Sequence, residues 1–203
     1  MRSEIDKTRS DVKKRYCWIC GEPANSREHK IKRSDIFRRY GRQSFQSLGG
    51  MLHFIAGEAH DLQGPSDKRL MYEPLICSNC NNTKSQPWDK AYEQFERWVF
   101  EHSRDIIKKR FIMMEEVFGT EKFSQACPAL YKYFIKAFGC RLVDSGMTVP
   151  DDLVTLLPRD KFLTRLRLTF AINKTIFLLD EDDRENYLGL GDLIRMDSRS
   201  MGI

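Results

Sequence analysis

The sequence lacks any run of about 18 apolar residues, the length that a membrane-spanning helix requires. It also lacks the apolar stretch of a secretory signal, because residues 1–15 are rich in charged side chains. These absences predict a soluble, cytoplasmic protein. With 203 residues, of which 41% are hydrophobic, the chain is large enough to bury a core, and no internal repeat interrupts it.

The chain has six cysteines, and their spacing is informative. Without an export signal, the six cysteines are expected to stay reduced, which argues against a disulfide framework. Cys127 and Cys140 stand alone in apolar, helix-like surroundings, so we expect them to be buried core thiols. The other four form two C-x-x-C pairs, Cys17 with Cys20 and Cys77 with Cys80.

Two C-x-x-C pairs can place four thiolates at the corners of a tetrahedron, the geometry of closed structural zinc sites. The stretch between the pairs, residues 21–76, is longer than in compact zinc ribbons, so other structure must be built inside it. Two coincidental pairs of core cysteines are one alternative. A redox motif is another, although no thioredoxin-like strand and helix arrangement accompanies the pairs. The spacing therefore predicts a structural Zn²⁺ site.

The net charge of +5 is modest, but residues 1–42 are strongly basic. A positive surface attracts the phosphate backbone of nucleic acids through Coulomb attraction and counterion release. A solvated charged surface is the alternative. The candidate contacts to DNA, or to RNA, are Arg27, Lys30, Lys32, Arg33 and Lys84.

Helical periodicity predicts three segments in the chain. A short helix is expected over residues 35–41, with Ser34 as its N-cap. Longer helices are expected from about Trp88 to Lys109, with Pro87 in the first turn, and from about Pro128 to Val143.

The remaining pattern mixes strands with one further helix. Residues 51–55 and 69–76 favour strands, separated by turn signals at Gly57 and residues 64–67. Residues 151–157, bounded by two prolines, predict a short helix. Short strands are expected over 162–170, 174–179 and 188–195. The expected class is α+β, with a mainly helical second half that ends in a few short strands.

Between the cysteine pairs, Glu28 and His29 place a carboxylate beside an imidazole. A hydrolytic nuclease needs a divalent cation to stabilise charge on the phosphate, and a base of near-neutral pKa to activate water. Glu28 suits the first role and His29 the second, and Asn81 could supply another oxygen ligand to the same hard cation. The alternatives are a surface ion pair for Glu28 and His29, and a capping role for Asn81.

This order of residues resembles the HNH, or ββα-metal, endonuclease superfamily. In its zinc-stapled branch the pattern reads C-x-x-C, then (D/E)-H, then C-x-x-C-(H/N)-x-x-K. The resemblance covers about residues 15–100. It implies a β-hairpin followed by an α-helix around one catalytic Mg²⁺ or Mn²⁺, with His29 as general base, Glu28 and Asn81 as metal ligands, and a separate structural zinc.

The resemblance implies a division into a basic arm (1–16), an HNH-like nuclease domain (17–109) and a C-terminal α+β region (110–203). Phage genes and defence systems use such nucleases. Tyr72 stands where the family often has an Asn that orients the base histidine. Tyr72 therefore keeps open the alternative of a catalytically inactive zinc-binding module for nucleic acid or protein. The C-terminal half could mediate a homodimer or bind a regulatory partner.

Overall fold

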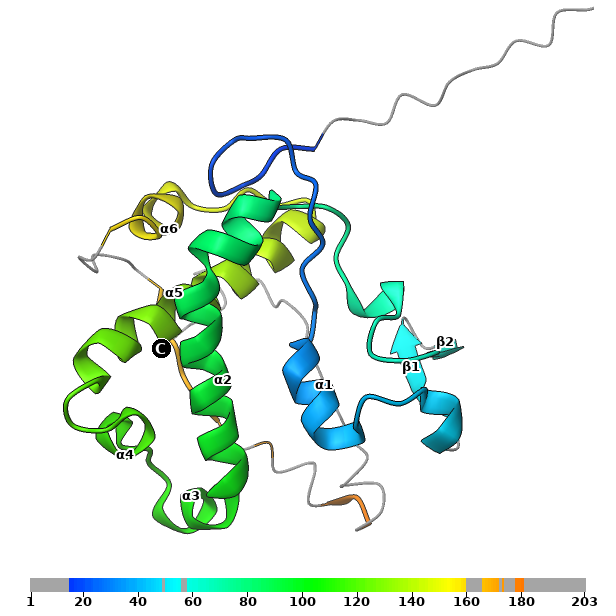
Figure 1. Cartoon of the computed structure of the whole chain (residues 1–203), viewed down its shortest axis with the longest axis vertical. Helices are drawn as coiled ribbons and strands as arrows, with labels where there is room; N and C mark the ends of the chain where they lie inside the picture. The colour runs from blue at the N-terminus through cyan, green and yellow to red at the C-terminus, as the bar shows by residue number, and fades with distance from the viewer. Residues whose placement is uncertain are drawn as a thin grey trace, which may run out of the picture.

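The computed structural model describes residues 15–48, 50–55, 58–159, 166–171, 173 and 178–180. Over these ranges the chain is a mixed α and β protein, as expected, with helices packed around α2 and α5 and a small hairpin beside them (Figure 1). None of the helices in these ranges is both long and apolar enough to span a membrane. The helices are α1 (Arg33–Tyr40), α2 (Gln86–Glu101), α3 (Ser103–Lys109), α4 (Met114–Phe118), α5 (Phe123–Asp144) and α6 (Asp151–Leu156).

Helix α1 confirms the first predicted helix but not its cap. It begins at Arg33 with Lys32 at the cap position, so Ser34 lies in the first turn, where its hydroxyl is 3.4 Å from Asp35 Oδ1. Gly41 ends the helix with a φ of 75°, a conformation that suits glycine, and its N–H donates to the Phe37 carbonyl oxygen.

Within the described ranges, the sheet is one antiparallel hairpin of β1 (Leu52–Ile55) and β2 (Glu58–Asp61). Strand β1 was predicted, whereas the predicted strand over 69–76 is wrong. A short 3-10 helix, Lys68–Leu70, forms there instead, capped by the Asp67 carboxylate, which accepts from the Arg69 N–H at 2.9 Å. Pro74 lacks an N–H, and residues 71–76 make only isolated bridges to residues 26–29.

Helix α2 begins with Pro87 in its first turn, as predicted, but the expected continuous helix to Lys109 is broken at His102. The His102 ring stacks on Trp98, and its Nδ1 lies 2.8 Å from the Trp98 carbonyl oxygen. The chain therefore turns at His102 and starts α3 one residue later.

Helix α5 ends as expected but begins at Phe123, before Pro128. The earlier turn forms because Phe123 and Ala126 pack against the core between α2 and α4. Helix α6 matches the prediction. Of the predicted C-terminal strands, residues 166–170 and 178–179 are described and form none, whereas residues 162–165, 174–177 and 188–195 lie outside the described ranges.

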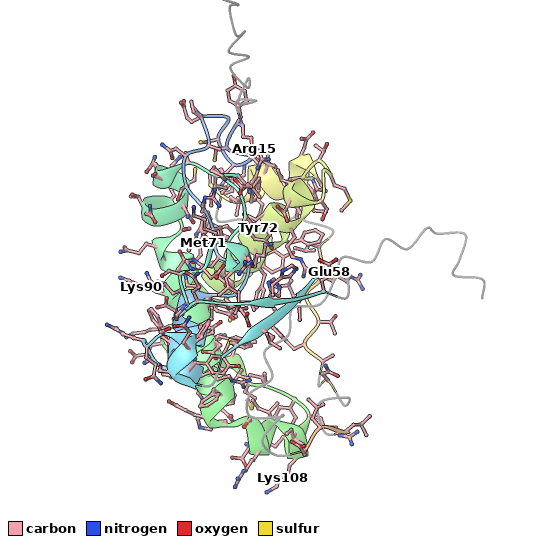
Figure 2. The ribbon with its side chains drawn as sticks, turned by 90° about the vertical axis from the view of Figure 1, so that its right-hand side faces the viewer. Arg15, Glu58, Met71, Tyr72, Lys90 and Lys108 are labelled. Atoms are coloured by element: carbon pink, nitrogen blue, oxygen red, sulfur yellow. The ribbon has the colours of Figure 1, made fainter. Side chains whose placement is uncertain are left out.

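Two buried clusters join the two halves of the chain. Trp88 of α2 packs with Tyr133 and Leu142 of α5 and with α6, while Phe95 of α2 packs with Leu130 of α5 and with α4. Residues on either side of the predicted boundary at residue 109 thus share one core. Figure 2 shows the hairpin, with Glu58 at its end, extending from the body of the molecule in which Tyr72 lies.

Candidate metal centre and the adjoining polar cavity

The four paired cysteines come together as predicted. Their sulfur atoms all lie within 4.8 Å of one another, and Cys20 Sγ is 3.6 Å from Cys77 Sγ. A tetrahedral zinc with bonds of about 2.3 Å separates its sulfurs by about 3.8 Å. Three of the four cysteines are buried, and Cys20 is exposed. This group can hold a metal ion such as zinc.

Each cysteine pair forms a tight turn stabilised by backbone hydrogen bonds. The Gly21 N–H donates to the Cys17 carbonyl oxygen at 2.8 Å, and the Cys80 N–H points to Cys77 Sγ at 3.4 Å. Burial raises the pKa of the Cys77 thiol, but this N–H and the neighbouring thiols lower it to about 7. Cys77 is therefore the member most easily converted to a thiolate, the form that binds metal, while burial raises the pKa values of Cys17 and Cys80.

Helix α5 supports the first cysteine turn. The Trp18 indole N–H donates to Cys140 Sγ at 3.5 Å, and the Trp18 ring packs over Gly139. A Cβ placed on Gly139 would lie 2.5 Å from the ring, so only glycine allows this approach. Cys140 is a buried thiol, as expected, whereas Cys127 is only half-buried.

Glu28 and His29 lie in an extended segment that pairs with the residues before the second cysteine pair. The Ser26 N–H donates to the Ile76 carbonyl at 3.0 Å, and the Tyr72 N–H donates to the Glu28 carbonyl at 2.9 Å. The second segment then leads through Cys77, Cys80 and a π-helical turn, Asn79–Lys84, into α2. Backbone pairing thus holds Glu28 and His29 beside the turn of the second cysteine pair, which leads into α2.

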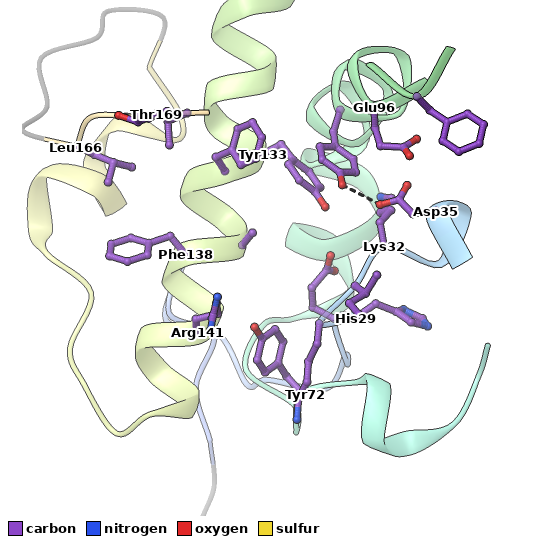
Figure 3. Close-up of a pocket in the computed structure, with 18 of the residues that line it drawn as sticks. His29, Lys32, Asp35, Tyr72, Glu96, Tyr133, Phe138, Arg141, Leu166 and Thr169 are labelled. Carbon is purple, nitrogen blue, oxygen red and sulfur yellow. Dashed lines mark hydrogen bonds between the residues drawn. The ribbon is translucent and has the colours of Figure 1, made fainter. Parts of the chain in front are cut away.

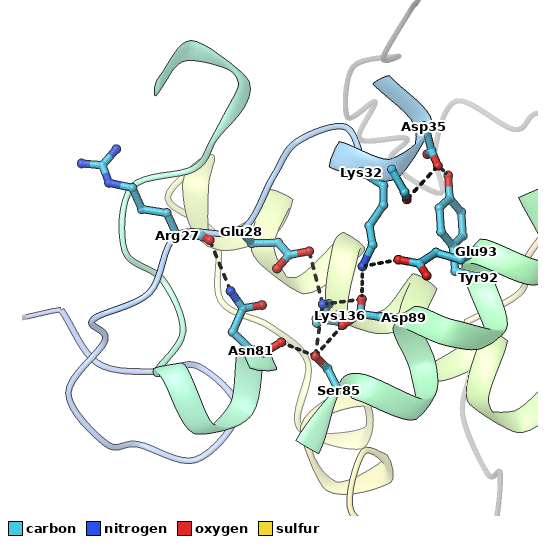
Figure 4. Close-up of polar contacts among 11 residues, drawn as sticks. Arg27, Glu28, Lys32, Asp35, Asn81, Ser85, Asp89, Tyr92, Glu93 and Lys136 are labelled. Carbon is cyan, nitrogen blue, oxygen red and sulfur yellow. Dashed lines mark hydrogen bonds and ion pairs between the residues drawn. The ribbon is translucent and has the colours of Figure 1, made fainter. Parts of the chain in front are cut away.

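The Glu28 carboxylate is nearly buried and faces a lysine from α5 (Figure 4). Glu28 Oε1 lies 3.2 Å from Lys136 Nζ, and the Lys136 side chain is 1% exposed. Burial raises the pKa of Glu28, opposed in part by Lys136. Nothing in the sequence pattern pairs these residues, although Lys136 occupies the same helical stripe as the buried Tyr133 and Cys140.

Lys136 also contacts Asp89 Oδ1 at 2.9 Å and Ser85 Oγ at 3.3 Å, both at the start of α2. Burial lowers the pKa of Lys136, but Glu28 and Asp89 raise it by more. Asp89 also pairs with Lys32, whose Nζ lies 2.7 Å from the same oxygen. Burial raises the pKa of Asp89, but the two lysines lower it by more. The buried network therefore alternates carboxylates and ammonium groups.

Asn81 is buried and fixed by its amide nitrogen, which donates to Ser26 Oγ at 2.9 Å and to the Arg27 carbonyl at 3.2 Å. Its Oδ1 is buried and accepts no hydrogen bond within the described part of the chain. A buried acceptor without a donor is costly, and such atoms often mark functional sites. The Ser85 hydroxyl connects Asn81 with Lys136: it donates to the Asn81 backbone carbonyl at 2.5 Å and accepts from Lys136 Nζ.

His29 is half-buried, and its Nε2 is likewise buried without a hydrogen-bond partner among the described residues. Burial lowers the pKa of the imidazole and the Arg33 charge lowers it further, while the Pro65 carbonyl partly opposes them. His29 is therefore neutral at neutral pH, the form that can accept a proton.

The basic residues predicted to contact nucleic acid occupy different environments. Lys84 is exposed, Arg27 pairs with Glu73 at 3.0 Å, and the Arg33 guanidinium lies over the Phe37 ring at 4.8 Å. Lys32 instead belongs to the buried network. Lys30 lies 5.8 Å from the centre of the Tyr72 ring, so its charge stays beside the site.

A cavity of about 670 Å³ lies between residues 28–39, α2, α5 and residues 166–169 (Figure 3). Glu28 and His29 both line it, but Asn81 is not among the described residues of its wall. Within the described ranges, the four cysteines are the only cluster of three or more Cys, His, Asp or Glu side chains close enough to share one ion.

Comparisons with protein-family models, with curated proteins and with solved structures gave no match to this chain. The fold and site therefore define its class by themselves: a mixed α and β protein with a four-cysteine cluster that can hold a metal ion, beside a buried charged network.

Proposed function

We propose that this chain is a metal-dependent endonuclease of the HNH type that hydrolyses phosphodiester bonds in DNA. One observation carries the proposal: backbone pairing places the Glu28-His29 segment against the chain that runs through the second cysteine pair into α2. Two paired extended segments, a helix and a four-cysteine cluster are the parts that the sequence resemblance implies. A long excursion containing α1 and the hairpin separates the two extended segments.

His29 is the general base in this proposal. Its lowered pKa keeps the imidazole neutral. No donor among the described residues occupies the Nε2 lone pair that would accept the proton. Glu28 and the Oδ1 of Asn81 would hold Mg²⁺ or Mn²⁺. The ion would stabilise negative charge at the phosphate and the leaving 3′ oxygen. The unsatisfied Asn81 oxygen supports this assignment, because carbonyl oxygens are ligands for such hard cations.

The Lys136 ammonium group would compete with the divalent cation for Glu28. It contacts the same Glu28 carboxylate that the divalent cation would use, so the cation would have to bind the second carboxylate oxygen or displace the lysine. The same contact favours a second candidate function, an inactive zinc-binding module that recognises nucleic acid. Tyr72, in place of the usual Asn, favours it as well.

A metal series separates the two candidates. Supercoiled plasmid and a single-stranded oligonucleotide would be incubated with the full chain in Mg²⁺, Mn²⁺, Ca²⁺ or no added cation. The nuclease proposal expects cutting in Mg²⁺ or Mn²⁺ only. Asn81→Ala should lower the rate by about 10- to 100-fold, whereas Asn82→Ala, a neighbouring exposed asparagine, should not.

Absence of cutting on both substrates in every cation, with one zinc still bound per chain, would reject the nuclease proposal. The second candidate then expects binding to duplex DNA that weakens as salt rises, with a smaller salt dependence in Lys84→Gln.

The C-terminal half remains a proposed site for a homodimer contact or a regulatory partner. Because α5 supplies Lys136 and shares the core of α2, a truncation at Arg110 would remove part of the site itself. Point substitutions on exposed residues of α3 or α4 are therefore the better test of such a partner.

A further inference from the structure

We propose that the cavity beside Glu28 and His29 binds a single nucleotide unit, with its phosphate at Lys30, Tyr72 and Arg141 and its base along Phe138. The nucleotide site rests on the cavity alone. Its connection with strand cleavage rests on the proposed function.

The size and walls of the cavity fit a ligand of this class. A volume of about 670 Å³ lies within the range of small-molecule sites, about 300–1,000 Å³. Both halves of the chain form the wall, so the ligand would be enclosed between the Glu28-His29 segment and α5 (Figure 3).

Charge on the wall favours an anion. Six basic residues line the cavity against three carboxylates, and each carboxylate has a partner inside the protein, as do Lys32, which pairs with Asp89, and Arg38, which pairs with Glu96. Glu28 contacts Lys136, Asp35 accepts from the Tyr92 hydroxyl at 2.7 Å, and Glu96 pairs with Arg38. The six basic residues are Lys30, Lys32, Arg38, Arg39, Arg141 and Arg167.

Two of these cations meet at one tyrosine. Lys30 Nζ lies 5.8 Å from the centre of the Tyr72 ring. Burial raises the pKa of the Tyr72 hydroxyl, the Arg141 charge lowers it, and the Asp144 and Glu28 charges raise it. Figure 3 shows the Tyr72 hydroxyl directed toward Arg141. A lysine near the Tyr72 ring, a guanidinium and the phenol supply the kinds of donor that phosphate oxygens require.

The same cavity wall carries an aromatic side chain, Phe138, on the side of α5 where Leu166 lies (Figure 3). Phe138 and Arg141 lie three residues apart on α5, so they share a helix face, and both line the cavity. Tyr133 is already stacked on Tyr92, with ring centres 3.9 Å apart, whereas Phe138 is half-buried on the wall. Stacking of a base on an aromatic side chain contributes about 1–3 kcal/mol. A ring next to a phosphate site fits a nucleotide better than an isolated anion.

Calorimetric titration of the zinc-loaded full chain without added divalent cation tests the proposal. The probes are deoxyadenosine 5′-monophosphate, deoxyadenosine and inorganic phosphate. The monophosphate should bind at least about tenfold more tightly than either fragment. Arg141→Gln should weaken it by about tenfold or more, and Phe138→Leu should weaken both the monophosphate and the nucleoside. The matched controls are Arg104→Gln and Phe111→Leu, exposed residues outside the cavity wall.

Equal affinity for phosphate and the monophosphate would overturn the proposal, as would unchanged affinity in a folded Arg141→Gln protein. If Arg141→Gln does not fold, Lys30→Gln replaces it with the same expectation. If a single-stranded pentanucleotide displaces the monophosphate from the cavity, the natural ligand is a nucleotide within a DNA strand. If it does not, the natural ligand is a free nucleotide. Because no Mg²⁺ or Mn²⁺ is added, the binding result is independent of whether the chain cuts DNA.

Discussion

Lys136 Nζ lies 3.2 Å from Glu28 Oε1 and joins the two halves of the chain at the candidate site. The same ammonium group contacts Asp89, which also pairs with Lys32, so two lysines face two buried carboxylates. This arrangement makes the second half of the chain part of the site, and it links the stability of the fold to the charge of the site.

Replacement of Lys136 by Met should destabilise the protein. It leaves Glu28 without its buried partner and Asp89 with Lys32 alone, and removing one member of a buried ion pair costs about 3–5 kcal/mol. Urea unfolding at neutral pH measures the loss. Lys108→Met, an exposed lysine on α3, should change the free energy of unfolding by no more than about 0.5 kcal/mol.

If Glu28 belongs to a cation site, Mg²⁺ should restore more stability to the Lys136→Met protein than it adds to the wild type, because the ion supplies the missing positive charge. An equal effect of Mg²⁺ on both proteins would argue against cation binding at Glu28.

Substitution of Cys80 by Ser should release the metal and much of the stability that depends on it, because the cluster loses one of four ligands. The expected zinc content falls from one per chain to well below one, with a lower unfolding temperature. Cys127→Ser is the matched control, since this cysteine lies outside the cluster. Full zinc occupancy in Cys80→Ser would contradict the four-cysteine assignment.

The pKa of His29 should lie below the ordinary value of 6.5, which NMR titration of the ring measures directly. Because the unfolded chain takes up the proton more readily, stability should fall as the pH drops through about 6.5, until the pH reaches the folded pKa. His53 also has a lowered pKa and adds a loss of the same sign. His29→Gln should reduce this pH dependence, and His53→Gln separates the second contribution.

Gly139→Ala should destabilise the protein, although alanine in a helix is normally more favourable than glycine by about 0.5–1 kcal/mol. The added methyl group would meet the Trp18 ring at 2.5 Å, and overpacking of this kind costs about 1–3 kcal/mol. Trp18→Leu in the same chain should recover part of the loss. A neutral Gly139→Ala would show that the first cysteine turn can move away from α5.

Local patterns in the sequence predicted the elements that depend on local chemistry. The C-x-x-C spacing predicted the cysteine cluster, apolar periodicity predicted α2 and α5, and two flanking prolines predicted α6. The failures also have local causes: Pro74 prevents a regular ladder over 69–76, and the His102 ring interrupts the long helix.

The sequence could not predict the partners of Glu28. The lysine that faces it belongs to a helix in the other half of the chain, and its position depends on the packing of α5 against α2. The available signal was a lysine placed on the buried stripe of α5, which requires a carboxylate partner inside the protein. Likewise, the unsatisfied oxygen of Asn81 is a property of the folded site and has no signature in the residue pattern.

The most direct test of the nuclease account is the initial rate of plasmid cleavage in Mg²⁺ or Mn²⁺ for wild type, His29→Ala and His60→Ala, with zinc measured in each protein. The account predicts that His29→Ala loses about 10²- to 10⁴-fold in rate with one zinc per chain retained, because a general base contributes about this much. His60→Ala, in the hairpin and outside the cavity wall, should cut at the wild-type rate. Cleavage by His29→Ala at the wild-type rate, or no cleavage by the zinc-loaded wild type, would contradict it.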